Sequence, residues 1–147
     1  MAARENRTED AEKLLLAVVW SKWGQKYKYN NAPSPPEPDR AKTAYERAIA
    51  WRPDYGFAHY ELGNLALEAS NEEEAGSAAA KEQLAKAAGH FTEAVRLSPR
   101  SLLFVNNLGV ALINQGKAEE AIAVEDDGRR AAGRLPASQL ESSDTRD

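Results

Sequence analysis

Cysteine is absent from this 147-residue sequence, histidine occurs only twice, and no long apolar run is present. Without cysteine the chain can form no disulfide, no zinc thiolate site and no thiol nucleophile, which suits a reducing compartment such as the cytoplasm while leaving an organelle open. The longest apolar run, Leu14–Trp20, has seven residues. Because about 20 are needed to cross a bilayer, the sequence predicts a soluble protein without a transmembrane segment.

Groups suited to catalysis are also scarce. His59 falls at a predicted core position and His90 on a helix flank, and the two are not spaced as a metal-binding pair. No serine or aspartate is placed beside a base, and Gly24, Gly63 and Gly109 stand singly rather than forming a phosphate-binding loop. We therefore predict no enzymatic activity, no catalytic residue, no metal, no cofactor and no small-molecule substrate.

Charge is distributed unevenly along the chain. Residues 1–53 carry ten basic and seven acidic side chains, whereas residues 54–147 carry nine and sixteen, which gives net charges of +3 and −7. The mild overall charge of −4 argues against a general nucleic-acid binder. An early segment rich in aromatics and lysine leaves a stacking surface for single-stranded nucleic acid open, but we interpret its Trp20, Trp23 and Tyr27 as core residues of a helical repeat.

Two segments of the chain align without gaps. Ala41–Pro53 and Ala87–Pro99 both read Ala-x3-aromatic-x2-Ala-x4-Pro. Residues at this spacing share one face of a helix, where alanine allows a neighbouring helix to approach, and the proline marks the helix end.

A second pattern precedes each of these segments and occurs a third time. Gly24, Gly63 and Gly109 each follow a large residue and precede an apolar one at constant spacing. Glycine inside a helix costs about 1 kcal/mol relative to alanine. Three equivalent glycines therefore predict that two helices cross too closely there for a Cβ.

Together the patterns resemble the tetratricopeptide repeat, a helix-turn-helix unit of 34 residues with the signature Trp-x2-Leu-Gly-x2-Tyr, Ala-x3-Phe and Pro. The positions that carry the resemblance in two full units are Trp20, Trp23, Gly24, Tyr27, Ala41, Tyr45, Ala48 and Pro53, then His59, Leu62, Gly63, Ala66, Ala87, Phe91, Ala94 and Pro99. A third unit begins with Leu108, Gly109 and Leu112 and then drifts, because Glu125 and Gly128 stand where an aromatic and a small helix former are expected.

The resemblance implies an all-α fold of about three such units, stacked as a short right-handed superhelix. We place the repeats at about 11–53, 54–99 and 100–133 within a domain of residues 11–135, between a flexible N-terminus at 1–10 and a disordered tail at 136–147. The expected helices cover about 8–29, 39–52, 55–69, 72–97, 101–115 and 117–132.

Two departures from the family pattern carry expectations of their own. The distance from Gly63 to Gly109 exceeds one repeat by twelve residues, and its Ala-, Glu- and Lys-rich sequence predicts an elongated second repeat with one long helix over 72–97. The drifting third unit leaves Ile122, Val124 and Leu135 apolar, so we expect an incompletely capped C-terminal end that a partner or a second copy covers.

The family's usual role implies a non-enzymatic scaffold or adaptor that binds a partner peptide or helix on the concave face formed by the first helix of each pair. The residues expected there are Lys22, Gln25, Tyr29, Tyr60, Glu61, Asn64, Asn106, Asn107, Val110 and Asn114, flanked by Ser21, Lys28 and Glu68. A chaperone-tail clamp is not predicted, since Tyr60 stands where that clamp needs lysine. The alternative is a structural subunit or an assembly or import factor of a larger, organellar complex, and an RNA-associated repeat is less favoured.

Overall fold

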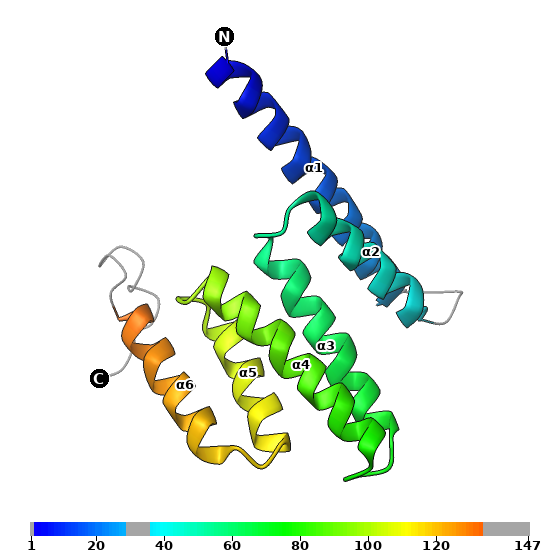
Figure 1. Ribbon diagram of the computed structural model, residues 1–147, viewed down its shortest axis with the longest axis vertical. Helices are drawn as coiled ribbons and strands as arrows, with labels where there is room; N and C mark the ends of the chain where they lie inside the picture. The colour runs from blue at the N-terminus through cyan, green and yellow to red at the C-terminus, as the bar shows by residue number, and fades with distance from the viewer. Residues whose placement is uncertain (1, 29–35, 134–147) are drawn as a thin grey trace, which may run out of the picture.

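A computed structural model describes residues 2–28 and 36–133, with side chains from residue 7 onward. The described residues form six helices and no strand. They are α1 (Ala2–Lys28), α2 (Pro38–Trp51), α3 (Gly56–Glu72), α4 (Ala78–Leu97), α5 (Leu102–Asn114) and α6 (Ala118–Ala132). Successive helices run antiparallel and form three pairs in series, α1–α2, α3–α4 and α5–α6 (Figure 1). The predicted all-α repeat architecture is confirmed, and the right-handed twist of the stack stays a prediction.

Local sequence explains where the later helices begin. Ser77 caps α4, because its Oγ accepts a hydrogen bond of 3.1 Å from the backbone N–H of Ala80. Ser101 caps α5 through Phe104 N–H at 3.4 Å. Pro38 opens α2, where its missing N–H has no helical partner to lose.

The three pairs are built around a close approach of a glycine in the first helix to a side chain in the second. An ideal Cβ on Gly24 would lie 2.6 Å from Cε1 of Tyr45, and one on Gly63 would lie 2.6 Å from Cε1 of Phe91. Both rings are fully buried. The prediction that these helices cross too tightly for a Cβ is therefore confirmed in the first two pairs.

The third pair departs from this arrangement, as its sequence does. Glu125 occupies the position of the two aromatics, and its Oε1 would lie 3.0 Å from a Cβ on Gly109. Gly128 replaces the expected alanine and lets Val105 of α5 approach α6, with Cγ1 2.7 Å from where a Cβ would stand. The last pair thus packs closely through a different glycine and without a buried ring.

The predicted helix over 72–97 is wrong at its start. Residues 73–77 form a turn between α3 and α4, because Gly76 has a φ of 80° and Ser77 begins the next helix. The elongation is instead shared by both helices of the pair, which have 17 and 20 residues against 13 to 15 in α2, α5 and α6. The alternative of a separate inserted domain is not seen in this segment.

Other boundaries lie close to those expected. Helix α1 begins at Ala2, earlier than the predicted residue 8, so the N-terminal residues 2–10 continue the helix. Residues 29–35 and the predicted tail at 136–147 lie outside the described residues. Searching the described part of the chain finds no helix with the length and apolar character needed to cross a membrane.

Candidate partner-binding surface

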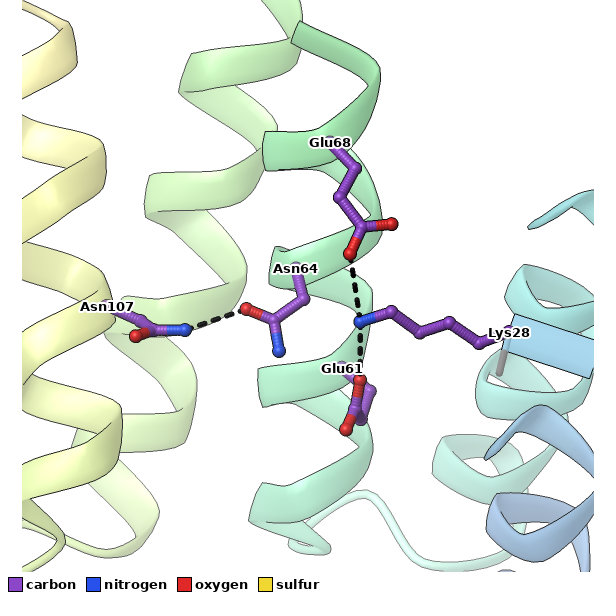
Figure 2. Close-up of polar contacts among 5 residues, drawn as sticks. All are labelled: Lys28, Glu61, Asn64, Glu68 and Asn107. Carbon is purple, nitrogen blue, oxygen red and sulfur yellow. Dashed lines mark hydrogen bonds and ion pairs between the residues drawn. The ribbon is translucent and has the colours of Figure 1, made fainter. Parts of the chain in front are cut away.

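The first helices of the three pairs, α1, α3 and α5, are joined by polar side chains, and we call their common side the first-helix face. Figure 2 shows Lys28 of α1 reaching toward α3 from one direction, and Asn107 of α5 reaching α3 from the other. Equivalent faces of successive pairs therefore form one continuous surface. This surface contains most of the residues predicted to bind a partner.

An amide pair connects α3 with α5. Nδ2 of Asn107 donates a hydrogen bond of 2.7 Å to Oδ1 of Asn64, and both side chains are half-buried. The bond fixes the orientation of both amides and leaves Nδ2 of Asn64 and Oδ1 of Asn107 as a further donor and acceptor (Figure 2). The sequence prediction placed both residues on this face but did not foresee the bond between them.

A lysine bridging two glutamates connects α1 with α3. Nζ of Lys28 lies 3.0 Å from Oε2 of Glu61 and 3.3 Å from Oε1 of Glu68 (Figure 2). Lys28 and Glu61 are buried, whereas Glu68 is exposed. Removing one member of a buried ion pair leaves the other charge uncompensated, so this cluster fixes how the first two pairs sit together.

The burial of Glu61, Ser21 and Lys28 corrects the expectation that all three face outward. Ser21 lies on the side of α1 that also contains the buried Ala17. For Glu61 and Lys28 the physical reason is that the second pair packs against the end of the first, where the two side chains pair with each other. Glu61 therefore holds the scaffold together rather than presenting a carboxylate to a partner. Glu68, two helical turns further along α3, keeps its carboxylate accessible.

Tyr60 belongs to an aromatic cluster that links three helices. Its ring stacks on Phe104 of α5 at a centroid distance of 5.0 Å and tilts against Phe91 of α4 at 6.0 Å. The side chain is half-buried, so one part of the ring packs and the rest is accessible. Replacing Tyr60 with alanine would therefore disturb the core as well as the surface.

Helix α5 contributes the most apolar part of the first-helix face. Leu103, Asn106, Val110 and Ile113 are all exposed and follow one another at intervals of three and four residues, which places them on one side of the helix. Asn114 is exposed at the end of this row. Leu103 and Ile113 were missed by sequence reasoning, although their spacing with Val110 carried the signal.

The remaining predicted residues are placed less centrally. On α1, Lys22 is exposed and Gln25 is half-buried, while Tyr29 lies outside the described residues. Asn106 also lines a cleft of about 190 Å³ with Glu125 and Arg129 of α6. A larger cleft of about 590 Å³ opens beside Lys28 and Glu68, where the elongated α3 extends past the start of α2.

The early aromatic residues do not all have the predicted core role. Trp20 and Tyr27 pack against the first core cluster, and the guanidinium of Arg47 lies 4.7 Å from the Trp20 ring centroid. Trp23, in contrast, is 42% exposed, with the Lys26 ammonium 4.6 Å from its ring centroid. The prediction that Trp23 is a core residue is therefore wrong, because no further helix of the described chain packs on that side of α1.

Both histidines have structural surroundings. Nε2 of His59 lies 2.8 Å from the carbonyl oxygen of Pro53 at the preceding turn. His90 was expected to be solvated, but it is half-buried and lines a cleft of about 220 Å³ with Lys42 and Lys86. Burial, with a further contribution from the charge of His59, lowers the pKa of His90 below its ordinary value.

Comparison with known proteins agrees with the repeat architecture. A family model described as Tetratricopeptide repeat matches residues 37–84 and 77–136, which together are more than half of the chain. The chain therefore belongs to the tetratricopeptide repeat family, whose repeats suggest a protein–protein interaction scaffold and are typically non-enzymatic. The search of curated proteins found no match. The Gly24–Tyr45 contact, the same as that of Gly63 with Phe91, extends the repeat into α1 before the matched range.

Proposed function

We propose that this protein is a scaffold or adaptor that binds a peptide or helix of a partner protein on its first-helix face. The observation that carries the proposal is the Asn64–Asn107 pair, which lies at the junction of α3 and α5 beside a row of exposed residues. The residues of this row lie outside the core, whereas the second helices bury Ala41, Tyr45, Ala87 and Phe91 in it.

The amide pair suits recognition of a polypeptide backbone. An extended peptide offers alternating N–H and C=O groups that must find partners when they leave water. The remaining amide donor of Asn64 and carbonyl acceptor of Asn107 supply one of each, and their mutual bond holds them in place before a partner arrives. Such contacts bind many sequences, so the neighbouring side chains have to provide selectivity.

The apolar row of α5 and the charges near α1 indicate what a partner segment carries. Leu103, Val110 and Ile113 favour an apolar side chain at one end of the segment. At the other end, Lys28 stands with two glutamates, so the cluster has a net charge of −1 and its exposed member, Glu68, favours a basic residue. We therefore propose a segment with an apolar part over α5 and a lysine or arginine near the end of α3.

The proposal is tested with peptides selected against the wild-type protein from a randomised display library. We expect Asn107→Ala to weaken the selected peptides by about tenfold or more, which corresponds to the loss of a well-placed polar contact. Val110→Lys should act at least as strongly, because it places a charge in the apolar row.

Gln83→Ala is the matched control. Gln83 is also a half-buried amide, but it lies on α4 and lines the cleft between α2 and α4. Circular dichroism of each variant checks folding, since Asn107→Ala also removes a hydrogen bond worth about 1 kcal/mol. If Gln83→Ala weakens binding while Asn107→Ala and Val110→Lys leave it intact, the site lies on the second helices and the proposal fails.

A second candidate is a permanent subunit of a larger assembly, and one observation favours it. Leu102 and Ile113 of α5 and Ile122 of α6 are all more than half exposed on the last pair of the stack. Terminal repeats usually need a polar outer face, so a stable neighbour at this end would account for the pattern. Purification from the native source distinguishes the two: a subunit elutes in a stoichiometric complex, whereas an adaptor exchanges its partners.

A further inference from the structure

The side of α1 that faces away from the rest of the stack carries an apolar stripe. Leu15, Val19 and Trp23 follow one another at intervals of four residues and are 62%, 42% and 42% exposed. Ala17, Ser21 and Gly24 are buried on the opposite side of the same helix. The stripe is therefore separate from the first-helix face and from the contacts with α2.

The positions equivalent to Val19 and Trp23 are buried in the later pairs, whereas those equivalent to Leu15 lie before the helices. Counting from the conserved-spacing glycine of each repeat, Val19 and Trp23 correspond to Ala58 and Leu62 in α3, and to Phe104 and Leu108 in α5. Those four side chains are at most 8% exposed. In the second repeat this side of α3 belongs to the core cluster that also contains Ala41, Tyr45 and Ala48 of the antiparallel α2. The stripe on α1 is thus a helix-packing face that has no antiparallel neighbour among the described residues.

The charges flanking the stripe are arranged symmetrically about Val19. Glu12 stands seven residues before it and Lys26 seven residues after it, and both are exposed. Leu15 and Trp23 stand four residues before and after it. If a second α1 lies antiparallel with Val19 at the two-fold axis, Leu15 of each copy meets Trp23 of the other, and each Glu12 meets a Lys26. A parallel arrangement would instead place like charges together.

We propose that this protein forms an antiparallel homodimer through the outward side of α1, with a second copy of the chain as the occupant of the Leu15–Val19–Trp23 stripe. The interface is isologous, so the same patch serves both copies. Three apolar side chains per copy make it smaller than the interfaces of obligate dimers, and we expect a reversible equilibrium in the micromolar range. The part of the first-helix face that lies on α3 and α5 stays open in the dimer.

Sedimentation equilibrium of the full chain over a range of concentrations tests the proposal. We expect the wild-type protein to dimerise and Leu15→Glu to raise the dissociation constant about tenfold or more. Ile122→Glu tests the rival surface for a second copy, because Ile122 is 60% exposed at the opposite end of the stack, and it should leave dimerisation through α1 unchanged. Both changes are on helix surfaces, and unchanged circular dichroism confirms that the variants fold.

Charge exchange tests the antiparallel register. Glu12→Lys alone and Lys26→Glu alone should each weaken self-association, because every contact between these positions becomes repulsive. A mixture of the two single variants should form a heterodimer more tightly than either forms a homodimer, and the double variant should recover dimerisation. A wild-type protein that stays monomeric at high concentration, association abolished by Ile122→Glu but not by Leu15→Glu, or a mixture with no preference for the heterodimer would each overturn the proposal.

Discussion

Replacing Gly63 with alanine is expected to destabilise the fold, although alanine is the better helix former. The new Cβ would lie 2.6, 2.7 and 2.9 Å from three atoms of the Phe91 ring, well inside the ordinary contact range that begins at 3.4 Å. Phe91 is fully buried, so its ring has no free space into which to move. Overpacking of this kind costs about 1 to 3 kcal/mol, and the contact distance favours the upper end.

Helix propensity offsets part of this cost. Alanine gains about 1 kcal/mol over glycine inside a helix. The net loss expected for Gly63→Ala is therefore about 2 kcal/mol. Gly24→Ala should behave alike, because Tyr45 is equally close and equally buried.

Two other glycines provide controls within the same chain. Gly89 lies inside α4 with no atom within 4 Å of an added Cβ, so Gly89→Ala should stabilise the protein by about 1 kcal/mol. At Gly109 the atom nearest to an added Cβ is the flexible carboxylate end of Glu125, at 3.0 Å. The stability gained by Gly109→Ala should therefore lie between zero and the full gain expected from helix propensity.

Urea denaturation followed by circular dichroism measures the free energy of unfolding for the four variants, and equal m-values show that the comparison is valid. The double variant Gly63→Ala/Phe91→Leu should lose less stability than the sum of the losses of the two single variants, because the smaller side chain relieves the overlap. If Gly63→Ala and Gly89→Ala stabilise the protein equally, the glycines do not mark close helix crossings and the packing argument is refuted.

Four further substitutions probe the repeats. Glu125→Phe should stabilise the last pair by about 1 kcal/mol, because a ring would pack over Gly109 as the aromatics of the other pairs do; a lower thermal midpoint would contradict this. Ser77→Ala should cost about 1 kcal/mol through loss of the α4 cap, and more than Ser101→Ala, whose bond is longer; equal losses would count against the cap geometry. The lowered pKa of His90 means that the unfolded chain takes up a proton first as the pH falls, so this contribution to stability is present above about pH 6.5 and is lost as the pH falls below it; His90→Gln should flatten the pH dependence of unfolding below about pH 6.5.

Repeat architecture was predictable because its signals are local. Gly24 with Tyr45 and Gly63 with Phe91 each stand at the same place in the two local patterns of a repeat, and each pair makes one helix crossing. The turn at Gly76 and Ser77 also has a local signal in the sequence, but the helix-forming composition around it favours one continuous helix. The positive φ of Gly76 becomes visible only in the structure.

The composition of the candidate site was only partly predictable. Spacing places Glu61 and Ser21 on the outward side of their helices, but their burial depends on how one pair packs against the next. The buried Lys28–Glu61 bridge joins residues 33 positions apart and has no counterpart in the repeat signature. The exposure of Trp23 follows from a missing neighbour rather than from its own sequence, which is why a core role was assigned to it.

Mapping a bound peptide by nuclear magnetic resonance tests the central claim most directly. A peptide selected against the wild-type protein is titrated into the isotope-labelled chain, and perturbed backbone and side-chain amide signals are assigned. We expect the largest changes on the side-chain amides of Asn64, Asn107 and Asn114 and on the backbone around Val110. Changes confined to α2, α4 and α6, with these signals unmoved, would contradict binding on the first-helix face.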